Sequence, residues 1–321
     1  MTMKYYLGMD IGGTKCAVVL CEKDSQSIYA KKRFDTKSER GWRAVTDELI
    51  GSASELMKEK GIKSEDVIAC GVSCGGPLNP DTGVIMCPPN LPDWDNVPLA
   101  DMVKERLGIP CKVRNDADAC ALAEWQFGSG KGTKSMIFLT FGTGMGAGLI
   151  LDGRLYSGFG GTAGEVGHIR LASDGPVGYG KAGSFEGFCS GGGLAKLGEM
   201  MLSDYKGETL LESGSITAKS IAEAAKQGDE LSLSIYRKCG EKLGEGLSVL
   251  IDILNPERIV IGSIFQRSGE LMKEEMNAVI RREALSVNAA QCQIVPALLG
   301  DEIGDFAAIG VAREFAEVRN G

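Results

Sequence analysis

Short apolar runs alternate along the chain with longer stretches in which apolar residues recur at helical spacing. The short runs predict buried strands, and the longer stretches predict helices that cover them. The predicted strands are 5–9, 16–21, 66–72, 113–116, 136–141, 149–151, 258–263 and 293–297. The predicted helices are 41–60, 117–125, 194–201, 271–282 and 305–318, with further helices between 217 and 254. Strands that alternate with helices, without internal repeats, predict an α/β fold.

The most informative stretch of the chain is the glycine-rich segment 139–169. Apolar runs on either side of Gly142, Gly144, Gly146 and Gly148 predict a β-hairpin. Because glycine has no Cβ, the N–H groups of such a turn can approach phosphate oxygens. Gly142, Thr143 and Gly144 are therefore candidate phosphate-binding residues, although a plain tight turn is the alternative. The glycine spacing matches neither the dinucleotide fingerprint nor the P-loop.

A second glycine turn joins the first two predicted strands, in the sequence Asp10-Ile-Gly-Gly-Thr-Lys15. Backbone amides at Gly12 and Gly13, with the side chains of Thr14 and Lys15, can contact phosphates. The Asp10 carboxylate can hold a hydrated Mg²⁺ ion. A plain turn is again the alternative, but two such hairpins in one chain favour phosphate binding.

The strand that ends at Asn115-Asp116 runs directly into a predicted helix. Open α/β sheets bind ligands at such junctions. A carboxylate there can take the proton of an attacking hydroxyl, which makes Asp116 the candidate general base. The alternative is that Asp116 caps the helix. Asp118, two residues further on, is the less suitable base.

Several further segments carry candidate ligand-binding side chains. Glu165 and His168, the only histidine, follow the central hairpin. Asn90 and Trp94 lie in the proline-rich loop 88–94, where they either line a pocket or anchor the loop through a buried tryptophan. Residues 175–183 are expected to form a flexible loop, and Glu186 follows it.

Composition narrows the classes of function. A chain of 321 residues is long enough for about two domains. A net charge of −8 without a basic run disfavours nucleic-acid and anionic-membrane partners. The ten cysteines are scattered, which is typical of reduced and mostly buried thiols. Neither a signal peptide nor a membrane span is predicted, so a cytoplasmic location is expected.

These motifs, in this order, resemble those of the ROK family (repressors, open reading frames and sugar kinases). The resemblance rests on D-I-G-G-T-K from Asp10, Asn115-Asp116, F-G-T-G-M-G-A-G from Phe141 and G-T-A-G-E-V-G-H from Gly161, and runs from about Leu7 to Ala312. It implies the actin-like, ribonuclease H-like ATPase fold, with ATP and sugar meeting in a cleft between two α/β domains. The smaller domain would comprise 1–117 plus 305–321, and the larger 118–304.

The resemblance also implies roles for individual residues. The implied ATP-binding residues are Asp10, Gly12, Gly13, Thr14, Lys15, Gly142, Thr143, Gly144, Gly146 and Gly262, although Ser263 stands where the family usually has glycine. Asn115 would bind sugar and Asp116 would be the base. Glu165, His168 and Glu186 would hold the sugar hydroxyls.

One departure from the family pattern concerns zinc. Many members bind Zn²⁺ through this histidine and three cysteines, in the form C-x-C-G-x-x-G-C-x-E. Alignment on Glu186 places Val177, Tyr179 and Ser184 at the cysteine positions. Valine cannot ligate zinc, so no zinc site is expected. The loop would then be held by packing.

The expected function is ATP- and Mg²⁺-dependent phosphorylation of a hexose, with glucose and its 6-hydroxyl as the first choice. N-acetylmannosamine, mannose, fructose and allose remain open. The alternatives are a non-catalytic sugar-binding regulator and an actin-like filament or chaperone ATPase. Only nine residues precede Asp10, where family repressors carry a DNA-binding segment, so DNA binding is not expected. The family resemblance suggests a homodimer.

Overall fold

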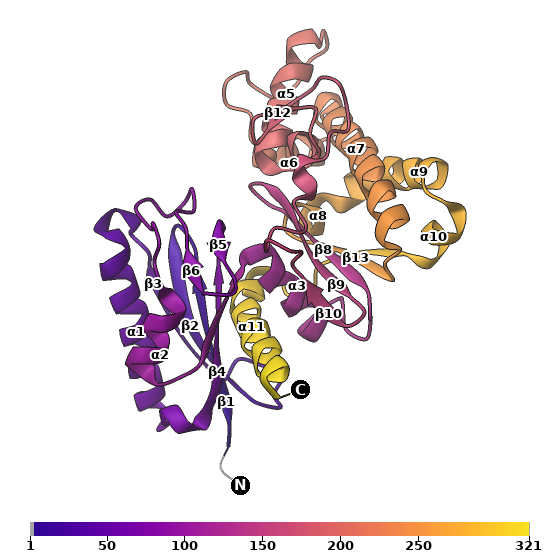
Figure 1. The fold of residues 1–321 in the computed structure, drawn as a ribbon. Helices are drawn as coiled ribbons and strands as arrows, with labels where there is room; N and C mark the ends of the chain where they lie inside the picture. The colour runs from indigo at the N-terminus through magenta and orange to yellow at the C-terminus, as the bar shows by residue number, and fades with distance from the viewer. Residues whose placement is uncertain (1–2, 321) are drawn as a thin grey trace. The chain divides into compact units, whose positions relative to one another are not determined.

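The computed structural model describes residues 3–320, whose fold is drawn in Figure 1. By internal contacts the chain divides into two compact units. The first runs up to Lys131 and includes Ser157–Gly161 and the chain from Asp301 onward. The second comprises Gly132–Tyr156 and Thr162–Gly300. Both units contain helices and a β-sheet, so the predicted α/β class is confirmed.

The first unit is built on a five-stranded sheet in the order β3-β2-β1-β4-β7. Its strands are β1 (Tyr5–Ile11), β2 (Lys15–Glu22), β3 (Ala30–Asp35), β4 (Val67–Cys74) and β7 (Cys111–Asn115). The pairs β1–β2 and β2–β3 are antiparallel, whereas β1–β4 and β4–β7 are parallel. A small hairpin, β5 (Leu78–Asn79) with β6 (Val84–Ile85), follows β4.

Helices cover both faces of this sheet. Figure 1 shows α1 (Gly41–Glu59) and α2 (Leu99–Leu107) on one face and α11 (Ile303–Asn320) on the other. The helix α3 (Asp116–Phe127) packs against α11. Side chains alternate along β1, so Leu7 and Met9 enter the apolar core with α1. Gly8 and Gly71 face α11, because a Cβ on either would collide with that helix.

The second unit is built on a five-stranded sheet in the order β10-β9-β8-β13-β14. Its strands are β8 (Met136–Phe141), β9 (Met145–Leu151), β10 (Arg154–Tyr156), β13 (Arg258–Ile261) and β14 (Gln293–Pro296). Its helices are α4 (Phe185–Phe188), α5 (Gly191–Asp204), α6 (Ala218–Lys226), α7 (Glu230–Leu254), α8 (Ile264–Ser268), α9 (Lys273–Glu283) and α10 (Ser286–Gln291). They share one apolar core with the sheet. The 3₁₀ turns of the chain are η1 (Ser38–Arg40), η2 (Ser64–Asp66), η3 (Val166–His168), η4 (Gly269–Leu271) and η5 (Gly300–Glu302).

The two sheets have the same topology. In each, the first three strands in sequence form an antiparallel meander, and the next two add in parallel beside the first strand. The turn between the first and second strands carries the glycines in both sheets, at Gly12–Gly13 and at Gly142–Gly144. The sequence has no detectable repeat, so this likeness is visible only in the fold.

Most predicted strands and helices are confirmed, and three differences are informative. Residues 175–183, predicted as a flexible loop, contain a short hairpin in which β11 (Val177–Gly178) pairs with β12 (Lys181–Ala182). Trp94 is fully buried and anchors its loop, so it does not line an open pocket. The first unit, as defined by contacts, extends to Lys131, beyond the expected domain boundary after residue 117. The reason is that α3 packs on α11 within this unit.

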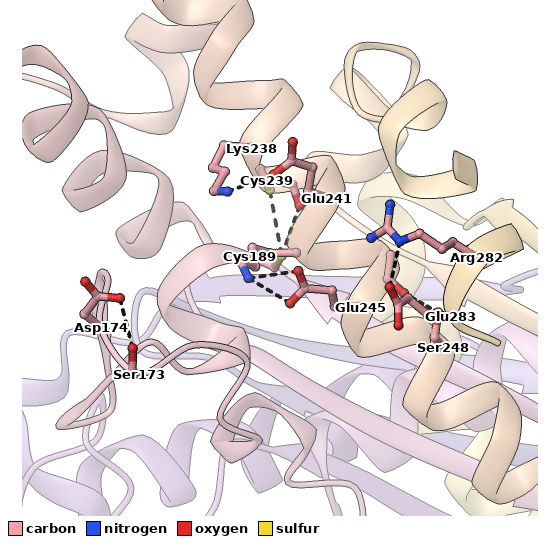
Figure 2. Close-up of polar contacts among 12 residues, drawn as sticks. Ser173, Asp174, Cys189, Lys238, Cys239, Glu241, Glu245, Ser248, Arg282 and Glu283 are labelled. Atoms are coloured by element: carbon pink, nitrogen blue, oxygen red, sulfur yellow. Dashed lines mark hydrogen bonds and ion pairs between the residues drawn. The ribbon is translucent and has the colours of Figure 1, made fainter. Parts of the chain in front are cut away.

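All ten cysteines are free thiols, and six of them are buried. Figure 2 shows Cys189, which follows α4, beside Cys239 of α7, with their Sγ atoms 3.8 Å apart. Burial raises the pKa of the Cys189 thiol. This pair therefore packs as two small apolar side chains. None of the helices described between residues 3 and 320 is long and apolar enough to cross a membrane.

Candidate functional site

In the first unit, the glycine turn after β1 is held by a dense set of hydrogen bonds. Gly12 N donates to Lys15 O (3.0 Å), and Thr36 Oγ1 donates to Gly12 O (2.7 Å). Asp10 lies at the end of β1, while the Thr14 and Lys15 side chains are exposed at the start of β2. The turn therefore presents a hydroxyl and an ammonium beside a carboxylate, as its sequence predicted.

Two asparagines lie against glycines near this turn. A Cβ on Gly13 would lie 2.9 Å from Asn90 O, so only glycine permits this approach. A Cβ on Gly76 would lie 2.9 Å from Asn115 Nδ2. The Gly75-Gly76 pair after β4 was given no role from the sequence. The sequence signal that could have identified this pair is a double glycine at the carboxyl end of a buried parallel strand, where such sheets bind ligands.

Asn115, rather than Asp116, is the N-cap of α3. Asn115 Oδ1 accepts a hydrogen bond from Ala117 N at 2.7 Å. Asp116 is the first residue of the helix, is exposed, and accepts from the same N–H through Oδ1 at 2.8 Å. The N-cap position therefore belongs to Asn115, while the Asp116 carboxylate also accepts a backbone N–H at this end of the helix. Its carboxylate lies at the helix N-terminus, accessible to a ligand.

The Asp10 carboxyl lies in a negative environment. Burial raises its pKa from 3.8 to about 6, and a hydrogen bond with Ser73 opposes that rise. The carboxylates of Asp305 and Asp116 raise the pKa further. Asp305 itself forms an ion pair with Lys31. A carboxylate that is costly to ionise among other carboxylates suits a partner of positive charge. These residues fit a hydrated Mg²⁺ ion, which usually takes only one or two protein carboxylates.

Asp118 is buried, and its Oδ2 accepts a hydrogen bond from Ser157 Oγ at 2.9 Å. Burial raises the pKa of Asp118 to about 6; the Ser157 hydrogen bond and Arg114 lower it, and Glu314 and Asp116 raise it. Asp118 thus connects α3 to the segment Ser157–Gly161. It points away from solvent, unlike Asp116.

This raised pKa makes stability depend on pH. Above pH 6 Asp118 is ionised in both the folded and the unfolded chain, and the folded protein bears the desolvation cost. As the pH falls from 6 towards 4, only the folded chain takes up the proton, so the wild type gains stability. At pH 8 we expect the free energy of unfolding of Asp118→Asn to be about 2–3 kcal/mol higher than that of the wild type. That advantage should shrink towards pH 4. Urea titrations of both proteins at pH 8 and pH 4 measure this difference in stability. An equal difference at the two pH values would contradict the prediction.

In the second unit, the central glycine turn lies between β8 and β9, as predicted. Gly142 N donates to Gly144 O (3.2 Å), and Gly191 N donates to Gly142 O (2.8 Å). A Cβ on Gly144 would lie 2.8 Å from Glu186 Oε2. The turn therefore needs glycine partly because a carboxylate packs against it.

Glu165, His168 and Glu186 come from two short helical turns beside that hairpin. Glu165 is exposed and precedes η3, which ends at His168. Glu186 lies in α4, and its Oε2 accepts a hydrogen bond from Met145 N at 3.0 Å. A Cβ on Gly167 would lie 3.2 Å from the Glu186 Cβ. The structure thus brings η3 and α4 together, with Glu186 between η3 and the glycine turn.

A cavity of about 830 Å³ opens beside the same turn. Its lining includes Gly142, Thr143, Gly191, Thr217, Tyr236 and Arg267. This volume is in the range of small-molecule sites. The lining beyond Gly142 and Thr143 comes from distant segments and was missed from the sequence. The only local signal was the Gly191-Gly192-Gly193 run at the start of α5, since helix N-termini are common anion sites.

Ser263 lines this cavity in a strained conformation. Its φ of 54° and ψ of −107° belong to a region that favours glycine. Ser263 N donates to Gln266 Oε1 at 3.0 Å, and Arg267 Nη2 donates to Ser263 Oγ at 3.3 Å. These contacts hold the turn after Gly262 despite the missing glycine.

The positions aligned with zinc-binding cysteines make protein contacts instead. Ser184 is the N-cap of α4, and its Oγ donates to Gly178 O at 3.3 Å. Lys196 Nζ donates to Val177 O at 2.6 Å. Hydrogen bonds therefore hold the segment together, in addition to packing. Among the described residues, no three His, Cys, Asp or Glu side chains gather closely enough for a metal ion. The expectation of no zinc stays a prediction.

Comparison with known proteins gives consistent results. The family model described as ROK family matches residues 6–314. A glucokinase from Streptomyces coelicolor is 31% identical over 317 residues, which span 96% of this chain and 97% of that protein. A xylose repressor from Caldicellulosiruptor bescii is 28% identical over 87% of this chain and 70% of its own length. The crystal structure of a ROK family glucokinase from Streptomyces griseus, in complex with glucose and AMPPNP, has a TM-score of 0.74 at 30% identity, covering 97% of this chain and 99% of that one.

Proposed function

Because the chain belongs to the ROK family, we propose that it is an ATP-dependent hexose kinase that phosphorylates glucose at the 6-hydroxyl. The actin-like fold that the sequence implied is supported by the likeness to the Streptomyces griseus enzyme. The observation that carries the proposal is the exposed carboxylate of Asp116 at the N-terminus of α3. A repressor that only binds sugar has no need of a general base.

Within this proposal, Asp116 accepts the proton of the sugar hydroxyl as the oxygen attacks the γ-phosphate. Phosphoryl transfer is catalysed mainly by positioning and by charge stabilisation. Amides of the two glycine turns, with Thr14 and Lys15, would bind the phosphates. Mg²⁺, held near Asp10 through water, would neutralise negative charge on those phosphates.

Five side chains are proposed to bind the sugar hydroxyls. Asn90 and Asn115 would contribute amide groups from the first unit. Glu165, His168 and Glu186 would accept or donate hydrogen bonds from the second. Within the described residues, Glu186 uses Oε2 to bind Met145 N, which leaves Oε1 for a sugar hydroxyl.

The nucleotide would occupy the cavity beside Gly142. Its volume suits a ligand of nucleotide size, and Gly191 and Gly192 at the α5 N-terminus line it. Arg267 adds a positive charge to the lining.

The test is ADP release from Mg-ATP in the presence of glucose, mannose, fructose, allose and N-acetylmannosamine, with a no-sugar control. We expect sugar-dependent turnover that is fastest with glucose. The matched control is 6-deoxyglucose, which keeps the ring hydroxyls and lacks the attacking one. It should bind as a competitive inhibitor without stimulating ADP release.

The rival function is a non-catalytic sugar-binding regulator, which the similarity to a xylose repressor favours. Sugar binding by calorimetry without turnover on any sugar would support this rival over the kinase. Turnover on mannose or N-acetylmannosamine, but not on glucose, would keep the kinase and change its substrate.

A further inference from the structure

The hairpin β11–β12 has an unusual residue in its turn. Gly178 pairs with Lys181, so Tyr179 and Gly180 form a two-residue loop. Both have positive φ values, 45° for Tyr179 and 77° for Gly180. Such turns favour glycine, asparagine or aspartate, because a side chain at positive φ is strained. A tyrosine in the first position therefore costs stability locally.

The Tyr179 side chain gains little from burial, since 74% of its surface is exposed. Its ring contacts the imidazole of His168. The two ring centroids lie 4.8 Å apart at an interplanar angle of 69°, an edge-to-face arrangement. A strained and exposed aromatic residue that contacts a candidate substrate-binding side chain is better explained by function than by stability.

The same hairpin also holds the backbone of His168. Lys181 Nζ donates a hydrogen bond to His168 O at 2.7 Å. The hairpin is in turn fixed to α4, because Ser184 Oγ bonds Gly178 O. His168 is thus contacted at its ring by Tyr179 and at its backbone carbonyl by Lys181.

We propose that Tyr179 is a positioning residue, which holds the His168 ring in the orientation that binds a sugar hydroxyl. The inference rests on the proposed function of His168, and it deepens that function by naming what orients the ring. Tyr179 acts through His168 and does not itself touch the reacting atoms. Its hydroxyl is not required, because the contact is made by the ring.

The contact can be tested without any activity, because His168 is the only histidine. Its imidazole carbon-bound protons therefore give single, unambiguous NMR signals. We expect Tyr179→Gly and Tyr179→Asn to remove the ring-current shift of these signals, and Tyr179→Phe to preserve it. Both glycine and asparagine tolerate the positive φ, so the turn should survive.

Kinetics then test the positioning role. In Tyr179→Gly and Tyr179→Asn we expect the KM for the sugar to rise about threefold to tenfold, the range of one aromatic pair. The KM for ATP should not change, and kcat should change less than the sugar KM. Tyr179→Phe should restore the wild-type values. The melting temperature of Tyr179→Gly should equal or exceed that of the wild type, because the strain is relieved.

A ring-current shift and a sugar KM that both stay unchanged in Tyr179→Gly would overturn the inference. So would an equal rise of the sugar KM in Tyr179→Phe. A wild-type protein without turnover on any sugar would remove the kinase proposal alone. The NMR comparison would then still decide whether Tyr179 orients His168.

Discussion

Replacing Asp116 by asparagine is expected to lower kcat about 10²–10⁴-fold, the usual contribution of a general base. Asparagine has nearly the same shape and can still accept the hydrogen bond from Ala117 N through its amide oxygen. It cannot take a proton from the sugar hydroxyl. The KM values for sugar and ATP should change little, because binding does not require the proton transfer. Steady-state ADP release, with sugar affinity from calorimetry, measures both quantities.

The matched control is Asp118→Asn, which removes a carboxylate two residues away. Asp118 is buried against Ser157 and lies away from solvent. We expect this variant to keep kcat within about threefold of the wild type, because no catalytic step is assigned to it. Collapse of kcat in Asp118→Asn with normal turnover in Asp116→Asn would move the base to Asp118. Normal turnover in both would contradict the mechanism.

The largest effect on stability is expected from Gly71→Ala. A Cβ at this position in β4 would lie 2.2 Å from Ala308 O and 2.3 Å from Ala312 N of α11. Backbone atoms cannot rotate aside as side chains do, so α11 would have to move off the sheet. We expect a loss of about 3 kcal/mol or more, above the usual cost of one added methyl group. Thermal unfolding of the first unit, monitored by circular dichroism or by limited proteolysis, measures this loss of stability.

The same substitution at Gly51 provides the control with the opposite sign. Gly51 lies inside α1, and a Cβ there would meet nothing within 4 Å. Alanine is a better helix former than glycine, so Gly51→Ala should gain about 1 kcal/mol. Equal effects of the two substitutions would show that the contact between β4 and α11 does not limit the stability of the first unit.

The sequence predicted most of the elements because their signals are local. The runs 136–141 and 149–151 around clustered glycines define a hairpin without reference to the rest of the chain. The same holds for the turn from Asp10 to Lys15. Val45, Leu49, Ala53 and Met57 are buried along α1, as their spacing indicated.

Features that depend on distant contacts were predicted less well. The pairing of Val177–Gly178 with Lys181–Ala182 involves strands too short to show a pattern, and tyrosine gives no signal for a turn with positive φ. The burial of Trp94 depends on neighbours from other elements, which a proline-rich loop does not reveal. The cavity lining at Thr217, Tyr236 and Arg267 is assembled by folding alone. The N-cap of α3 is Asn115, one residue before Asp116, for which capping was the alternative to a role as general base.

The packing of α11 on β1 and β4 also bears on how the protein is made. This helix begins at Ile303, whereas the strands it covers precede residue 75. At usual rates of synthesis, the ribosome needs roughly 10 to 35 seconds to reach α11 after completing residue 131. During that interval one face of the first sheet lacks its cover while the second unit is being synthesised. The first sheet therefore receives α11 only after the second unit has been synthesised, and until then its uncovered face is exposed to aggregation.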